Sequence, residues 1–201
     1  LALFPGIEKY KKRQFDSYSS AGRFKEYFQL AKELEESEEP IVNPDEILGE
    51  GFKYSGDYIK AQERFLNMLA NSETENSALF GLKTLSLYTG DYTNYIFYSD
   101  RILQKGIEKN WNRVYANELA ERAFVLVFIF DKKDDSRLIL DELESILGDE
   151  EKNIQFDNLN LFSRIQLLDA YAYLGMWNKI DDEKINLIGF SQMNQKRYTA
   201  I

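Results

Sequence analysis

The chain has 201 residues with no cysteine and no histidine, and it carries a formal net charge of -9 at pH 7. Without thiols or imidazoles it forms no disulfides, no Cys or His nucleophiles and no soft-metal sites built from these ligands. The acidic balance also disfavours nucleic acid as the main partner. With 44% hydrophobic residues, three prolines and no apolar run of about 18 residues, the composition predicts a folded helical protein without a transmembrane segment.

The first helical hairpin is expected at about residues 7–37, and its start is basic because of the run Lys9-Tyr10-Lys11-Lys12-Arg13. This run has two interpretations: a basic helix face near an anionic membrane surface or partner, or the solvated first turn of a capping hairpin. The chain starts at Leu1 and not at methionine, so we expect an upstream segment, such as a signal peptide, to have been removed or left out. The compartment stays open between cytoplasm and envelope, and the excess of lysine over arginine is typical of low-GC bacteria.

Three turn signals recur at one interval, each 34 residues after the last: Gly22-Arg23-Phe24, Gly56-Asp57-Tyr58 and Gly90-Asp91-Tyr92. In each, a glycine in the left-handed region would end one helix, and an aromatic side chain would pack back across the turn. Two later turns are expected at Asp131–Asp134 and at Gly175. These signals predict five hairpins in one quasi-linear domain over residues 1–201, at about 7–37, 44–71, 76–105, 111–147 and 157–189.

The second hairpin carries the most explicit pattern: Leu48-Gly49, Phe52, Gly56-Asp57-Tyr58, Ala61 and Phe65. This spacing resembles the tetratricopeptide repeat (TPR), although Asp45 replaces the usual tryptophan and Glu73 the usual proline. The resemblance implies an all-α, right-handed superhelix of about five antiparallel helix hairpins. It also implies that the first helix of each hairpin lines a concave face, which would bind a peptide or helix of another protein.

Transferring the repeat geometry to this sequence gives a set of inward-facing positions that would contact a partner. They are Lys9, Lys12, Arg13 and Asp16 in the first hairpin; Glu46, Glu50, Lys53 and Tyr54 in the second; Phe80, Thr84 and Tyr88 in the third; Arg122 in the fourth; and Gln166, Asp169 and Tyr173 in the fifth. Repeats that clamp the carboxylate of a chaperone tail use an asparagine where Asp16 stands here. A chaperone-tail clamp is therefore not expected.

The leading functional hypothesis is a non-catalytic scaffold that binds another protein on its concave face, with no metal and no cofactor. The alternative is a structural or assembly factor of a bacterial envelope that docks through its outer surface. A third hypothesis is an enzyme with paired carboxylates such as Asp169 or Asp181-Asp182. Gly49-Glu50-Gly51 is followed by Tyr54 where the dinucleotide fingerprint requires glycine, and no phosphate-binding loop is present.

Overall fold

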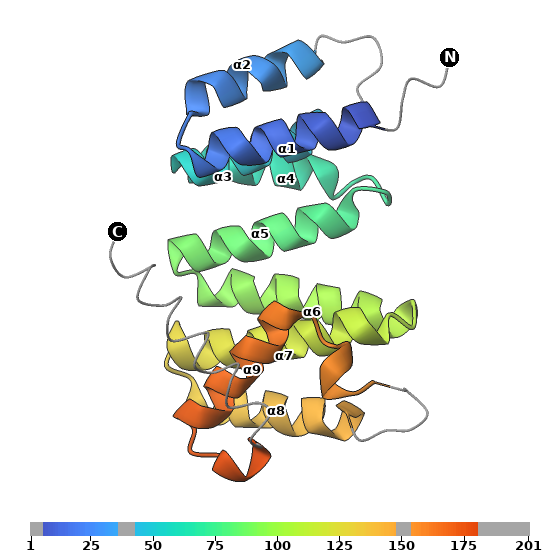
Figure 1. Cartoon of the computed structure of the whole chain (residues 1–201), viewed down its shortest axis with the longest axis vertical. Coiled ribbons are helices and arrows are strands. Elements are labelled where there is room, and N and C mark those ends of the chain that lie inside the picture. Colours follow the sequence, from blue (N-terminus) through green and yellow to red (C-terminus); the bar gives the residue numbers. More distant parts are fainter. Residues whose placement is uncertain (1–5, 36–42, 148–153, 181–201) are drawn as a thin grey trace. The chain divides into compact units, whose positions relative to one another are not determined.

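The computed structural model describes residues 6–35, 43–147 and 154–180, and all statements below apply to these ranges. Within them the chain is all-helical, without a strand (Figure 1). The helices are α1 (Gly6–Ser20), α2 (Phe24–Glu35), α3 (Pro44–Ser55), α4 (Tyr58–Met68), α5 (Glu75–Thr89), α6 (Tyr92–Glu108), α7 (Asn112–Phe128), α8 (Lys133–Leu147) and α9 (Leu161–Tyr173), with two 3-10 turns, η1 (Phe156–Asn158) and η2 (Trp177–Lys179).

The chain divides into two compact units, Leu1–Tyr98 and Ser99–Ile201, and the boundary falls inside α6. In the first unit α1 packs on α2 and α3 on α4, while α3 also touches both α1 and α5. In the second unit α7 packs against α8 and α9. Each unit is described by itself below.

The four glycines placed at turns by the sequence all have positive φ: 66° at Gly22, 85° at Gly56, 68° at Gly90 and 73° at Gly175. After Gly56, the N–H of Asp57 donates back to the carbonyl of Phe52 at 2.9 Å. The same bond, from the residue after the glycine to the carbonyl five residues earlier, follows the other three glycines. This is the Schellman pattern, which requires a left-handed residue and therefore favours glycine.

Two further turns use non-glycine residues in the left-handed region, Asn110 with φ 54° and Asp131 with φ 52°. Asn and Asp tolerate this conformation better than other side chains because their short polar groups bond locally. Helix α8 already starts at Lys133, so the later part of the turn expected at Asp131–Asp134 is helical. Helix α6 continues to Glu108, beyond the boundary at residue 105 expected from the sequence.

In the first unit the helices approach closely at two glycines that face one aromatic ring. A Cβ atom added to Gly49 of α3 would lie 2.8 Å from Cε1 of Phe65, and one added to Gly81 of α5 would lie 2.6 Å from the same atom. Phe65 of α4 is buried, so its ring fills the space that both missing side chains leave. Tyr27 of α2 completes the adjoining core, and its hydroxyl donates to the carbonyl of Ile47 at 2.7 Å.

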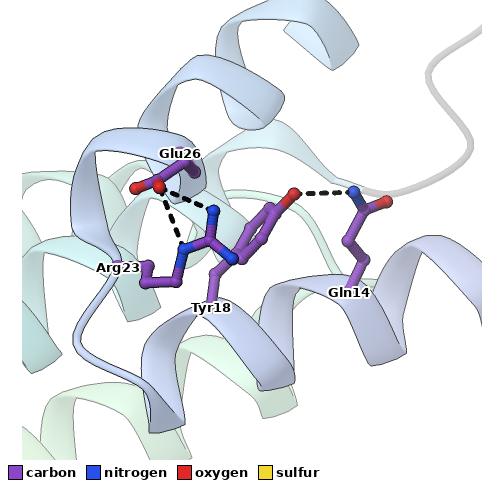
Figure 2. Close-up of polar contacts among 4 residues, drawn as sticks. All are labelled: Gln14, Tyr18, Arg23 and Glu26. Atoms are coloured by element: carbon purple, nitrogen blue, oxygen red, sulfur yellow. Dashed lines mark hydrogen bonds and ion pairs between the residues drawn. The ribbon is translucent and has the colours of Figure 1, made fainter.

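A polar cluster orders the turn between α1 and α2 (Figure 2). Arg23 donates from Nε and Nη2 to Oε1 of Glu26, at 2.9 and 2.7 Å, and its guanidinium lies 5.1 Å from the ring centroid of Tyr18. The hydroxyl of Tyr18 accepts a 3.0 Å hydrogen bond from Gln14. Because the Arg23–Glu26 pair is exposed, its contribution to stability is small.

The core of the second unit is aliphatic and is built mainly from small and branched side chains of α7, α8 and α9. Its fully buried members include Leu119, Ala123, Leu140, Leu143 and Leu167. The last predicted hairpin begins as expected with α9 and the Gly175 turn. Beyond η2, the second helix expected up to residue 189 lies outside the described residues.

Candidate functional site

A cavity of about 370 Å³ lies in the first unit and is lined by residues of α1, α2 and α3. We refer to it below as the α1–α3 cavity. Its described lining residues are Phe15, Asp16, Ser19, Ser20, Tyr27, Glu46, Ile47, Glu50 and Tyr54. Phe15 and Tyr27 are buried and form its floor as an edge-to-face pair, with ring centroids 4.8 Å apart. The tightly packed aromatic floor gives the cavity a fixed shape.

The helical period explains why carboxylates and one tyrosine gather at the rim of the cavity. Glu46, Glu50 and Tyr54 are spaced four residues apart along α3, so they share one face of that helix. Asp16 adds a third carboxylate from α1. Tyr54 as a residue is 50% exposed. The cavity therefore combines an apolar floor with a negatively charged, partly aromatic rim.

Lys53 was expected to face a partner, but its side chain is buried. Only 6% of the residue is exposed, and its Nζ lies 2.7 Å from Oε1 and 2.6 Å from Oε2 of Glu50. The same ammonium lies 4.8 Å from the ring centroid of Tyr54 and 6.0 Å from that of Phe65. Lys53 is thus an internal counterion, one turn of α3 from Glu50, and its charge is not offered to a partner.

Burial and nearby carboxylates raise the pKa values of the two tyrosines at the cavity, Tyr54 and Tyr27. Burial raises the pKa of Tyr54 to about 12, and the carboxylate of Glu50 adds to the shift. Burial likewise raises the pKa of Tyr27, with further contributions from the charges of Glu50, Asp16 and Glu46. Each negative charge disfavours a phenolate. All three carboxylates, Asp16, Glu46 and Glu50, therefore raise the pKa of the same phenol, that of Tyr27.

On α5 the expected partner-facing residues Phe80, Thr84 and Tyr88 follow one helix face, since they are four residues apart. Tyr88 is 51% exposed, and its ring stacks on that of Tyr58 with centroids 6.1 Å apart and planes within 5°. Burial raises the pKa of Tyr88, and Glu50 of α3 adds to the shift. Tyr88 is thus influenced by the charge of Glu50, although it is not one of the residues that line the α1–α3 cavity.

Lys83, which the sequence did not single out, is among the most deeply buried side chains of this unit. Its Nζ lies 5.2 Å from the ring centroid of Phe80, and the residue is 1% exposed. The only sequence signal is its place in the apolar run Leu79 to Leu85. Lys53 of α3 and Lys83 of α5 are therefore both buried inside the unit.

In the first hairpin, Lys9, Lys12 and Arg13 belong to α1. The side chains of Lys9 and Lys12 lie outside the described residues, so their expected role stays a prediction. Arg13 is exposed.

Of the expected partner-facing residues, the structure brings four together at one cavity: Asp16, Glu46, Glu50 and Tyr54. Tyr88 and Phe80 are exposed on α5.

In the second unit the expected partner-facing residues are mostly engaged inside the protein. The guanidinium of Arg122 donates to Oδ1 of Asp100 at 2.6 Å, and little of its side chain is exposed. Gln166 and Asp169 are buried. Tyr173 is exposed, but its ring packs against Phe128 with centroids 4.9 Å apart. These residues do not form one open charged surface.

The structure gives two findings on other site classes. Among the described residues, no group of three or more acidic side chains is arranged to hold a metal ion. None of the described helices has the length and hydropathy needed to cross a bilayer. Of the carboxylates considered for catalysis, Asp169 is buried, and Asp181 and Asp182 lie outside the described residues. No protein-family model, curated protein or solved structure matches this chain.

Proposed function

We propose that this protein is a non-catalytic scaffold of the tetratricopeptide type, whose first unit binds a peptide or helix of another protein along α1, α3 and α5. The observation that carries the proposal is the α1–α3 cavity, which the half-exposed Tyr54 lines, together with the half-exposed Tyr88 on α5, the helix that touches α3. Tyrosines of this kind are frequent anchors in protein interfaces, since they bury a large apolar area and keep a polar end.

The packing of the unit supports a preformed binding surface. Helix α3 touches both α1 and α5, and Gly49 and Gly81 allow α3 and α5 to close on Phe65. A surface held by rigid, close-packed helices loses little conformational entropy when a partner binds. The right-handed superhelical arrangement of all five hairpins is part of the same proposal, and it rests on the repeat pattern of the sequence.

The test is a selection of short random peptides, displayed on phage, against the immobilised full chain. Binding of the recovered peptides is then measured by fluorescence polarisation with the Tyr54→Ala/Tyr88→Ala variant. We expect Kd to rise at least about tenfold, since truncation of an aromatic anchor costs about 1–2 kcal/mol or more.

The matched control is Ile59→Ala/Leu66→Ala, which removes exposed apolar side chains from the second helix of the hairpin, α4. It should leave Kd unchanged. If the tyrosine variant binds every recovered peptide as tightly as the native chain, the concave-face scaffold is refuted. If only the α4 variant loses binding, the outer-surface docking hypothesis replaces it.

A further inference from the structure

The rim of the α1–α3 cavity holds more negative than positive charge. Asp16, Glu46 and Glu50 line it, and no described lining residue is basic. The buried ammonium of Lys53 compensates Glu50. Within the described side chains, the carboxylates of Asp16 and Glu46 take part in no ion pair, and both are accessible to solvent. Among the described side chains, these three carboxylates against the one ammonium of Lys53 leave two negative charges at the cavity.

The aromatic floor adds a second, independent preference for the same kind of ligand. The faces of phenyl and phenol rings attract cations, and they also pack well against methylene chains. The ring of Tyr54 already contacts the ammonium of Lys53 inside the protein. Phe15 and Tyr27 form the apolar bottom. A ligand with an aliphatic stem and a positive end therefore fits the cavity: the stem packs on the aromatic rings and the positive end pairs with the carboxylates.

The size of the cavity limits how much of a partner can enter. Ligand pockets usually measure about 300–1,000 Å³, and the α1–α3 cavity, at about 370 Å³, lies at the lower end. One long side chain fits this volume better than a whole helix does. An acidic side chain would be repelled there, and an apolar one would desolvate the rim carboxylates without pairing them.

We infer that the α1–α3 cavity receives one basic side chain, arginine or lysine, of the partner peptide. The inference rests on the proposed function and names the chemistry of its partner. The methylene stem packs on Phe15 and Tyr27, and the charged end reaches Asp16 and Glu46. Tyr88 on α5 binds a neighbouring part of the peptide.

The test uses the peptides recovered by selection on the full chain, together with versions in which each Arg or Lys is changed to Gln. Recovered peptides should share a basic residue, and its change to Gln should raise Kd about tenfold, as expected for a charge pair at a partly desolvated rim. Binding should also weaken as NaCl is raised, since screening acts on this pairing.

On the protein side, Asp16→Asn/Glu46→Gln removes the two charges and keeps the side-chain shapes. It should raise Kd for the basic peptide about tenfold and have little further effect on the Gln version, because both changes remove the same interaction. The control Glu63→Gln/Glu73→Gln changes net charge equally at exposed positions and should bind normally. Circular dichroism spectra check that every variant is folded.

The outcomes separate the inference from the proposed function. Peptides that need Tyr54 and Tyr88 but lack a required basic residue overturn the inference and leave the scaffold intact. An equal loss with Glu63→Gln/Glu73→Gln also overturns it, because the effect would then be one of net charge. Recovered peptides that are indifferent to both tyrosines overturn the proposed function itself.

Discussion

Replacing Gly81 by alanine tests how the first unit is packed. The added Cβ would lie 2.6 Å from Cε1 and 2.7 Å from Cδ1 and Cζ of Phe65, far inside normal contact. The ring has little room to retreat toward α3, because it already lies against the backbone of Gly49, where an added Cβ would be only 2.8 Å from Cε1 of the same ring. The strain must therefore spread into the helix packing.

The expected magnitude follows from two opposed effects. Overpacking a well-filled core costs about 1–3 kcal/mol, whereas alanine is favoured over glycine inside a helix by about 0.8–1 kcal/mol. The difference between these two effects runs from near zero to about 2 kcal/mol. Because the added Cβ would lie only 2.6–2.7 Å from three ring atoms of Phe65, we expect the upper half of this range, a fall in the free energy of unfolding of about 1–2 kcal/mol. For a chain of 201 residues that unfolds cooperatively, this lowers Tm by about 2–8 °C.

The assay is thermal and urea unfolding of the full chain followed by circular dichroism, with Phe65→Leu as the companion variant. Phe65→Leu alone should also destabilise the protein, because it leaves a void in the core. In the Phe65→Leu background, however, Gly81→Ala should cost clearly less, since the smaller side chain leaves room for the new methyl group. An unchanged or raised Tm for Gly81→Ala, or simple additivity of the two changes, would refute the close approach of α5 to Phe65.

Two further predictions concern the turn and the pH dependence. Gly56→Val should lower the free energy of unfolding by at least about 1 kcal/mol, as measured by urea denaturation, because φ at Gly56 is 85°. Folding raises the pKa of Tyr54 from 10.0 to about 12, so the folded state holds the phenol proton more tightly than the unfolded state does. The stability that results is fully present below pH 10 and is lost as pH rises toward 12. Absorbance at alkaline pH should show delayed ionisation of this phenol, and Tyr54→Phe should flatten the loss of stability in that range.

Much of the local structure could be predicted because it depends on neighbouring residues along the chain. The turns at Gly22, Gly56 and Gly90 follow from the low cost of positive φ for glycine. The start of α3 follows from Asn43, whose side chain accepts from the N–H of Asp45 and Glu46, with Pro44 in the first turn. The all-helical class follows from the same signals.

The candidate site was predicted only in part. The repeat geometry implied by the tetratricopeptide resemblance placed Glu46, Glu50 and Tyr54 among the inward-facing positions, and these residues line one cavity. It also assigned Lys53 to these positions, whereas the structure buries its ammonium against Glu50. The helical period gives the direction in which a side chain leaves the helix, but it does not give the depth at which a flexible four-carbon stem ends.

The helical hairpins and their turns can be predicted from the chain alone, because the backbone conformation at Gly56 or Asn43 depends on contacts within a few residues. The fit of Phe65 between Gly49 and Gly81, and the meeting of Asp16 of α1 with Glu46 of α3 at one cavity, become visible only in the folded molecule. These pairs are far apart along the chain, and their contact depends on how whole helices pack, which no local pattern encodes.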